Sequence, residues 1–304
     1  MLPTSKEYPK LVALIDRQLA VFPDHREYLE RRFNNSSVAS LQFCNEIAGM
    51  VERIAGTHLD KVLENYRWLC AEILKEELHF RRTGEYRLSS FADALEQVYA
   101  NREYMEKYVD GILASQLWWK NHAEVLRFYR DRFVNGNKPH FSHLEVGPGH
   151  GLFLHLAASS ESCAKAEGWD VSDASLAATR SALDAMSGGK SIELRQIQLL
   201  EAPEGSFDSI TFSEVLEHLE DPTEALRILH RLLAKGGRIF INAPVNSPAP
   251  DHLYLFKTPE AVVNMVEEAG FVVEETFFSP QTGATLERAR KLRLSISAAI
   301  IATR

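Results

Sequence analysis

The 304-residue sequence has few cysteines, no long apolar run and no repeated or low-complexity segment. Its three cysteines, Cys44, Cys70 and Cys163, are scattered and odd in number, which argues against a disulfide framework or a cysteine-based metal knuckle. No uninterrupted apolar run approaches the roughly 18 residues of a membrane span, and the first residues lack the apolar core of a signal peptide. These absences predict a cytoplasmic enzyme or binding protein with no membrane partner.

Positive charge is scarce in the second half of the chain. Residues 139–304 contain 14 Lys and Arg against 22 Asp and Glu, whereas residues 1–138 contain 20 of each. The second half therefore carries the whole net charge of −8. An acidic surface repels the phosphate backbone of DNA or RNA, so we expect no nucleic-acid partner.

The two halves also differ in their hydrophobic pattern. From about residue 37 to 133, apolar residues recur at helical spacing, as in LDKVLENYRWLCAEILKEELHF, and we expect one helical break near Asn101 or Gly111. The segment VNGNKPH, residues 134–140, combines glycine, asparagine and proline and predicts a domain boundary. We therefore expect an all-α domain at 1–138, followed by a second domain at 139–304.

The second half alternates between strand-like and helix-like segments, which predicts an α/β fold with a mostly parallel sheet covered on both faces. The last two strands follow each other without a clear crossover helix, so we expect a hairpin at the sheet edge. The basic segment LERARKLR, residues 286–293, is expected to be a solvated or anchoring strand edge. The expected strands are 141–146, 165–170, 192–197, 207–212, 238–242, 271–277 and 294–302, and the expected helices include 174–186, 223–234 and 259–269.

A glycine cluster marks the start of the second half. In HLEVGPGHGLFLHLA, Gly147, Gly149 and Gly151 separate a short apolar run from a run with helical spacing. Glycine allows a sharp bend and a close approach of a ligand to the backbone, so the pattern predicts a nucleotide-type binding corner. Asp170 lies 19 positions beyond Gly151, at the end of the next expected strand. Its carboxylate could accept both hydroxyl hydrogens of a ribose, or it could simply cap a helix or a turn.

Several motifs together resemble one family. LEVGPGHG, GWDVSDASL, GSFDSITFSEVLEHLEDP, LLAKGGRIFINAP and EEAGFVVEE occur in the order and at the spacing of the class I S-adenosylmethionine-dependent methyltransferases. The likeness is strongest to the small-molecule branch that includes ubiquinone-pathway-type O-methyltransferases, and it covers about residues 141–277. It implies a Rossmann-like, seven-stranded sheet preceded by an added helical domain. It also implies S-adenosyl-L-methionine as the cofactor and S-adenosyl-L-homocysteine as its product.

The resemblance also assigns the residues that would hold the cofactor. The three glycines would lie against the methionine portion, with Glu145 just beneath their loop, and Ser213 would meet the amino-acid end through its backbone. Asp170 would bind the ribose. Gln198 and Leu199 would contact the adenine, although the family often has Gly-Asp where this chain has Ile197-Gln198.

The acceptor side is less constrained by the sequence. A base for proton removal would be His218, His252 or His122, and His218 could instead be a polar residue that bonds the backbone. Tyr108, Trp119 and His122 share a helical stripe that could roof a substrate pocket or simply be a packing face. Further substrate candidates lie in the loop after the fifth expected strand: Asn242, Asn246 and Tyr254. Glu217 and His218 alone cannot make a metal site, so we expect none, although magnesium remains an option.

The most direct interpretation is a methyltransferase acting on the oxygen, nitrogen or carbon of a small molecule. A protein or carrier-tethered acceptor is the alternative within this class. A nicotinamide-dependent oxidoreductase fits less well, because its fingerprint is G-x-G-x-x-G rather than G-x-G-x-G. A non-catalytic binding protein fits less well still, because the glycines and Asp170 are intact. The helical half could be a lid over the acceptor, a homodimerisation unit, or both.

Overall fold

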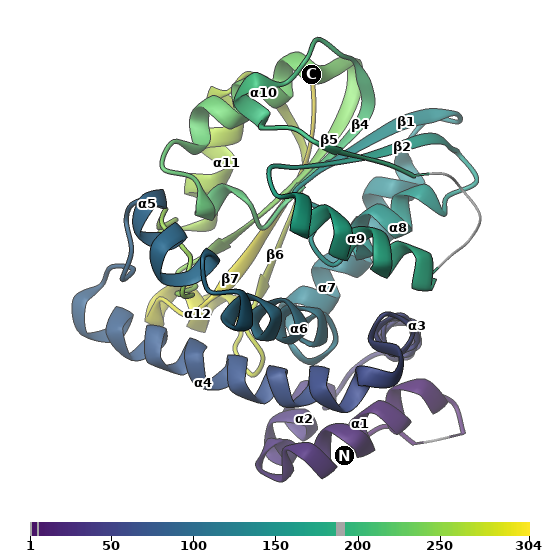
Figure 1. Ribbon diagram of the computed structural model, residues 1–304, viewed down its shortest axis with the longest axis vertical. Coiled ribbons are helices and arrows are strands. Elements are labelled where there is room, and N and C mark those ends of the chain that lie inside the picture. The colour runs from purple at the N-terminus through teal and green to yellow at the C-terminus, as the bar shows by residue number, and fades with distance from the viewer. Residues whose placement is uncertain (1, 5, 187–191) are drawn as a thin grey trace.

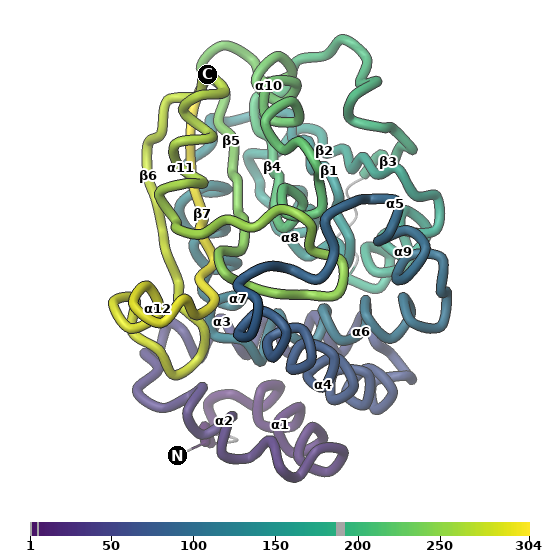
Figure 2. Tube along the Cα trace, turned by 90° about the vertical axis from the view of Figure 1, so that its left-hand side faces the viewer, coloured from purple at the N-terminus to yellow at the C-terminus, as the bar shows by residue number. Residues whose placement is uncertain are grey.

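The computed structural model describes residues 2–4, 6–186 and 192–304. Figures 1 and 2 place helices α1 to α4 at one end of the molecule and α10 with the C-terminus at the opposite end. Among these residues, no helix combines the length and the apolar character needed to cross a membrane.

The described residues from Pro9 to Gly136 are mainly helical, and the helices expected over about residues 37–133 are present. Asn101 ends the preceding helical segment and caps α6, because its side chain accepts the N–H of Tyr104 at 3.1 Å. Gly111 lies inside α6 and does not break it. A Cβ at Gly111 would lie 2.7 Å from Leu69 Cβ, so the glycine allows α6 to pack closely on α4. The helices are α1 (Pro9–Val21), α2 (Arg26–Phe33), α3 (Val38–Ala55), α4 (Leu59–Thr83), α5 (Phe91–Ala94), α6 (Arg102–Trp118) and α7 (Lys120–Phe128), with π-helical turns at Leu95–Tyr99 and Tyr129–Phe133.

A break that the sequence did not reveal lies at Trp119. This residue has an extended backbone (φ −86°, ψ 124°) and separates α6 from α7. The expected stripe of Tyr108, Trp119 and His122 is therefore not one continuous helical face, and its two parts can take different directions.

The second half forms a single seven-stranded sheet in the order β3-β2-β1-β4-β5-β7-β6. All pairs are parallel except those of β7, which runs antiparallel to both β5 and β6. All seven expected strands are present, with shifts of a few residues at their ends. The strands are β1 (Phe141–Val146), β2 (Cys163–Asp170), β3 (Ile192–Gln196), β4 (Phe207–Ser213), β5 (Leu233–Val245), β6 (Val272–Pro280) and β7 (Ile296–Thr303).

The expected strand edge at LERARKLR is wrong. The segment forms helix α12 (Leu286–Leu292), which begins after Thr285, whose hydroxyl accepts the N–H of Arg288 at 3.2 Å. Helix α12 buries Ala289 and lies in the connection between β6 and β7. β7 lies inside the sheet, between β5 and β6, so of these last two strands only β6 is at an edge, and β3 forms the opposite edge.

Helices cover both faces of the sheet, as the strand–helix alternation predicts. α8 (Leu152–Ala158) and α9 (Asp173–Met186) lie on the face that Phe240 points to, whereas α10 (Pro222–Leu232) and α11 (Pro259–Glu268) lie on the face of Ile239 and Ile241. Thr258 caps α11, whose first residue is Pro259.

The helical half shares one hydrophobic core with the first of these faces. Phe128 at the end of α7 stacks on Phe277 of β6, with ring centroids 5.0 Å apart. Tyr129 and Phe133 in the following π-helical turn pack on Phe240 of β5, at 4.9 and 5.6 Å. Burial of these aromatic rings fixes α7, and with it the end of α6, against the sheet.

Candidate active site

The glycine loop between β1 and α8 has the backbone that only glycine adopts without strain. Gly147, Gly149 and Gly151 have φ values of +71°, +48° and +73°. A Cβ at Gly147 would lie 2.9 Å from Val215 Cγ2, so this glycine is required by packing. A Cβ at Gly149 would meet no atom within 4 Å, so the backbone there borders open space. The Thr179 hydroxyl fixes the loop by donating to the Gly149 carbonyl at 2.7 Å.

Glu145 lies beneath this loop at the end of β1. It is 3% exposed, and its Oε2 finds no hydrogen-bond partner in the described part of the chain. Burial raises the pKa of its carboxyl well above the usual value. A buried carboxylate oxygen without a partner is a position where a ligand ammonium or hydroxyl could be bound.

Asp170 ends β2 at the same edge of the sheet. Its carboxylate accepts the N–H of Ser172 at 2.8 Å, and its carbonyl accepts the N–H of Ile197 at 2.9 Å. Burial raises the pKa of Asp170. The Ile197 bond brings Gln198 and Leu199 next to Asp170, just after β3, but none of these three residues lines the cavity described next.

A cavity of about 200 Å³ lies between the glycine loop, the end of β4 and the helical half. From the sheet side it is lined by Glu145, Gly147, Gly149, Ser213, Glu217, His218, Asn242 and His252. From the helical side it is lined by Tyr108, Val109, Ile112, Gln116, His122 and Val125. The structure thus brings together residues up to 147 positions apart in the sequence, from Met105 to His252, and both halves of the chain contribute walls.

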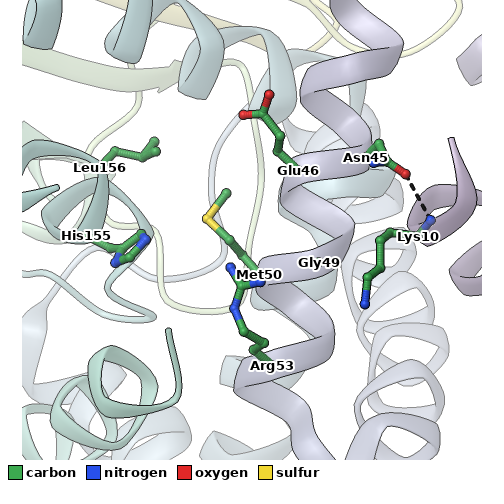
Figure 3. A pocket seen from close by; sticks show the side chains of 8 residues that line it. All are labelled: Lys10, Asn45, Glu46, Gly49, Met50, Arg53, His155 and Leu156. Carbon is green, nitrogen blue, oxygen red and sulfur yellow. Dashed lines mark hydrogen bonds between the residues drawn. The ribbon is translucent and has the colours of Figure 1, made fainter. Parts of the chain in front are cut away.

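A larger cavity of about 400 Å³ lies elsewhere, between α1, α3 and α8 (Figure 3). It contains none of the residues that the sequence singles out. Several of its polar groups already have partners: Asn45 accepts the backbone N–H of Lys10 at 2.9 Å, and Glu46 accepts from Arg130 at 2.8 Å. Volume alone therefore does not identify the site. The glycine-lined cavity is the better candidate, because many of the residues that the sequence singles out line it.

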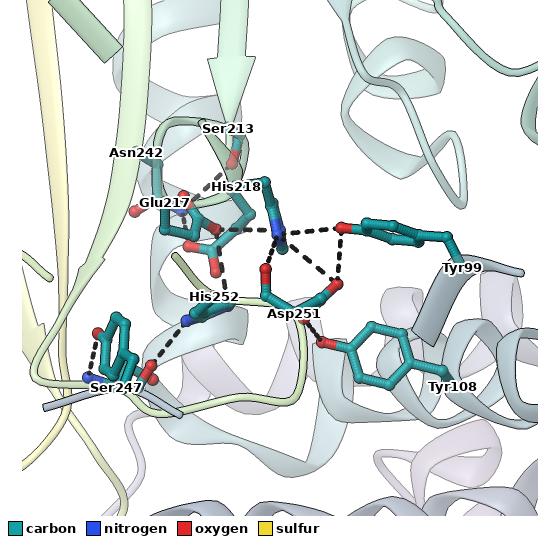
Figure 4. A network of polar contacts seen from close by, with 11 residues as sticks. Tyr99, Tyr108, Ser213, Glu217, His218, Asn242, Ser247, Asp251 and His252 are labelled. Carbon is teal, nitrogen blue, oxygen red and sulfur yellow. Dashed lines mark hydrogen bonds and ion pairs between the residues drawn. The ribbon is translucent and has the colours of Figure 1, made fainter. Parts of the chain in front are cut away.

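His218, just after β4, is the centre of a polar network (Figure 4). Its Nδ1 lies 3.1 Å from the carbonyl oxygen of Asp251 and 3.6 Å from the carboxylate Oδ2 of the same residue. A carbonyl can only accept, so Nδ1 carries a hydrogen, and in the neutral imidazole the lone pair is on Nε2. Asp251 is in turn held by two hydroxyl donors, Tyr108 at 2.7 Å and Tyr99 at 3.2 Å.

Asp251 remains ionised in this network. Burial opposes its charged form, but His218, His252 and the Tyr108 hydroxyl outweigh that effect and hold the pKa of the carboxyl below its usual value. The sequence analysis missed Asp251 and Tyr99. Asp251 precedes His252 in the loop after β5, which was a weak signal, whereas nothing in the sequence pointed to Tyr99.

Glu217 is 0% exposed and lies between two histidines. Its Oε1 is 3.6 Å from His218 Nε2 and 4.0 Å from His252 Nε2. Neither of its oxygens has a hydrogen-bond partner among the residues that the structure describes. Burial, and then the charge of Glu214, raise the pKa of Glu217 well above its usual value.

Glu214 is a second carboxyl that the sequence analysis did not single out. It has a left-handed backbone, with φ of +55°, and burial raises its pKa to about 7. Asn242 Nδ2 donates to Glu214 Oε1 at 2.7 Å and to Ser213 Oγ at 3.2 Å. Asn242 therefore links the ends of β4 and β5 at the cavity wall.

The other histidine candidates differ from His218. Burial lowers the pKa of His252 to about 4 and that of His122 to about 3, so both are neutral near pH 7. His252 Nδ1 lies 2.7 Å from the carbonyl of Ser247 and donates to it. His122 borders the cavity, with Nδ1 within 3.2 Å of Ser115 Oγ and Gln116 Nε2.

Three substrate candidates lie outside the cavity wall. Trp119 packs edge-on against His122, at 4.8 Å, and donates to Tyr66 at 3.1 Å, so it stands behind the wall rather than in it. Asn246 has φ of +47° and donates to the carbonyl of Lys257 at 3.0 Å, which fixes the loop after β5. Tyr254 packs on Phe256.

Glu217, His218 and His252 also form a group that could hold a metal ion, since one ligand atom of each lies within 4.8 Å of the others. Two imidazoles and one carboxylate suit zinc or a similar transition metal. Magnesium prefers oxygen ligands throughout, so this donor set does not favour it.

Comparison with known proteins agrees with this geometry. A family described as "Methyltransferase domain" matches residues 118–289, a range that begins at the end of α6 and contains the whole wall formed by the sheet. Ubiquinone biosynthesis O-methyltransferases of Pseudomonas paraeruginosa and Pseudomonas syringae are 35% identical over 116 residues and 32% identical over 126 residues. These alignments cover 37% and 40% of this chain and 47% and 52% of the relatives, so the chain spans about half the length of the curated relatives it matches.

Two solved structures share the fold over most of the chain. The mitomycin 7-O-methyltransferase MmcR superposes with a TM-score of 0.55 at 13% identity, over 88% of this chain and 76% of its own. An O-methyltransferase family protein from Burkholderia thailandensis gives 0.54 at 15% identity, over 82% and 73%. Because the family match covers more than half of the sequence, the chain belongs to the methyltransferase-domain family, and this membership implies S-adenosylmethionine as the cofactor.

Proposed function

We propose that the protein transfers a methyl group from S-adenosylmethionine to a hydroxyl oxygen of a small molecule bound in the cavity between its two halves. One observation carries this proposal: His218, with its Nδ1 held by the Asp251 carbonyl, lines a cavity that is walled by the glycine loop on one side and by α6 and α7 on the other. The named O-methyltransferases among the relatives support an oxygen acceptor.

The cofactor residues follow from the loop geometry. Gly149 offers open space beside its backbone, and Glu145 offers a carboxylate oxygen without a partner, which suits the ammonium of the methionine portion. Asp170 lies where a ribose would follow, with Gln198 and Leu199 beside it for the adenine. When bound, S-adenosylmethionine supplies a methyl group on a sulfonium, and its displacement by the acceptor oxygen leaves S-adenosylhomocysteine.

His218 acts as the general base in this proposal. Its Nδ1–H is held by Asp251, so Nε2 takes the hydroxyl proton of the acceptor as the oxygen forms its bond to the methyl carbon. The imidazolium that results faces the carboxylates of Glu217 and Asp251, each 3.6 Å away, which stabilises its charge. His122 and His252 are poorer bases, because a low pKa means a weak attraction for the proton.

The helical half is proposed to position and shield the acceptor. Tyr108, Ile112 and Gln116 on α6 face the glycine loop across the cavity, so an acceptor between them would be held against the methyl group and away from bulk water. Removal of residues 1–135 should therefore eliminate methyl transfer even where cofactor binding persists.

The test is a transfer assay with labelled S-adenosylmethionine and a panel of phenols and aliphatic alcohols, using His218→Gln and His79→Gln as the matched pair. His79 lies on α4, outside the cavity. Loss of turnover at unchanged S-adenosylhomocysteine affinity in the His218 variant alone supports the proposal. Equal turnover in both variants would show that His218 is not the base.

A further inference from the structure

We infer that the acceptor of this site is neutral or cationic, and that Glu217 is the residue that excludes anionic acceptors. This inference rests on the proposed function and adds the charge class of its substrate. Its basis is the balance of charges and hydrogen-bond groups around the cavity.

The cavity wall holds several acidic side chains but no lysine or arginine among the described residues that line it. Glu145, Glu214 and Glu217 line it, and Asp251 lies directly behind His218. The remaining wall is apolar or neutral, apart from the histidines.

Around Glu217, hydrogen-bond acceptors outnumber hydrogen-bond donors. His218 and His252 both use Nδ1–H to donate to a backbone carbonyl, of Asp251 and Ser247 respectively. Both Nε2 atoms therefore carry lone pairs, and both face Glu217 Oε1, at 3.6 and 4.0 Å. An ionised Glu217 gives three acceptors that converge on one point, with no donor among the described residues. Burial and the charge of Glu214, which raise the pKa of this carboxyl, show that its charged form is costly without a ligand donor.

A ligand that supplies hydrogen-bond donors would satisfy these acceptors. A hydroxyl or ammonium group near Glu217 would satisfy a fully buried carboxylate that otherwise lacks a partner. A carboxylate on the acceptor would instead add another acidic group beside Glu217, where the described wall offers no lysine or arginine to pair with it, which is unfavourable. The same geometry therefore favours neutral or cationic acceptors and disfavours anionic ones.

The test uses three catechols that differ mainly in the charge of the side chain: dopamine (cationic), 4-methylcatechol (neutral) and 3,4-dihydroxyphenylacetate (anionic). We expect kcat/KM for the first two to exceed that for the anion at least 100-fold in the full-length protein. Glu217→Gln should reduce this gap to tenfold or less. Glu201→Gln, which changes an exposed carboxylate outside the cavity, should leave the gap unchanged.

Calorimetric titration of the three catechols into protein saturated with S-adenosylhomocysteine gives a second readout that does not depend on turnover. It tests the charge class of the acceptor on the unmodified protein even where Glu217→Gln does not fold. Equal or preferred use of the anion would overturn the inference and leave the proposed methyl transfer intact. Loss of turnover with EDTA and its recovery with Zn²⁺ or Mn²⁺ would also overturn it, because a metal would then occupy the position of the ligand donor. Normal cofactor binding with no methylation of the catechols or of any phenol or alcohol in the panel would contradict the proposed hydroxylated acceptor itself.

Discussion

Gly149 allows the cofactor assignment to be tested by adding a single methyl group. Gly149→Ala places a Cβ at a backbone with φ of +48°, where no protein atom lies within 4 Å. The protein therefore pays only the penalty of a left-handed alanine, roughly 1–2 kcal/mol of folding free energy. The new methyl group projects into the space that the proposed cofactor would use.

Gly283→Ala is the matched control. Gly283 has φ of +82°, and a Cβ there also meets nothing within 4 Å, but it lies in the turn after β6, outside the cavity. The two variants should lose similar stability in urea unfolding. Because Gly149→Ala adds bulk where the ligand must approach, its affinity for S-adenosylhomocysteine should fall at least tenfold, which is about 1.4 kcal/mol.

Isothermal titration of both variants with S-adenosylhomocysteine provides the assay, and urea midpoints provide the stability comparison. An affinity loss confined to Gly149→Ala supports the assignment. Unchanged binding by Gly149→Ala would refute it, because the open space beside this residue would then serve no ligand.

Other consequences can be measured separately. Asp170→Asn should weaken S-adenosylhomocysteine binding by about 1–3 kcal/mol through loss of charged hydrogen bonds, and unchanged affinity would remove Asp170 from the ribose site. Trp119→Phe should lower stability by about 1 kcal/mol through the lost bond to Tyr66, with little change in turnover; a large fall in kcat at unchanged stability would instead bring Trp119 into the acceptor site. The free energy of unfolding should fall as the pH drops from about 6.5 towards 4. In that range the unfolded chain binds protons at histidines whose pKa is lowered in the folded chain, and each such histidine contributes up to about 1.4 kcal/mol per pH unit. The raised pKa values of the buried glutamates oppose this trend, so equal urea stability at pH 7 and pH 5 would show that they cancel it, contrary to our expectation. Burial lowers the pKa values of five histidines to about 3 or 4: His25, His122, His143, His150 and His252.

The sheet could be predicted because its signals are local. β1, the glycine turn and α8 follow one another within 18 residues, and each has its own periodicity or turn chemistry. Helix α12 was missed because it has only seven residues, and its basic side chains obscured the apolar positions. The break at Trp119 was missed because the sequence there contains no glycine or proline. Tertiary packing of α7 on β6 and β7, rather than a local signal, redirects the chain at that point.

The acceptor side could be predicted only in part because it is assembled from distant segments. His218 and His252 were identifiable by residue type and by their position at the carboxyl ends of β4 and β5. Their partners were not: Tyr99 and Asp251 are 152 positions apart, and their contact depends on how the helical half packs over the sheet. Asn246 and Tyr254 were expected at the same edge, but their side chains turn into the loop instead of towards the cavity.

The most direct test of the account is a crystal structure of the protein with S-adenosylhomocysteine. The account predicts that the methionine portion lies against Gly147 and Gly149, with the ribose at Asp170. It also predicts that the sulfur points into the cavity between His218 and α6. Binding of the ligand in the cavity near Arg53, or a sulfur more than about 10 Å from His218, far beyond the roughly 3–3.5 Å of reacting atoms, would contradict it.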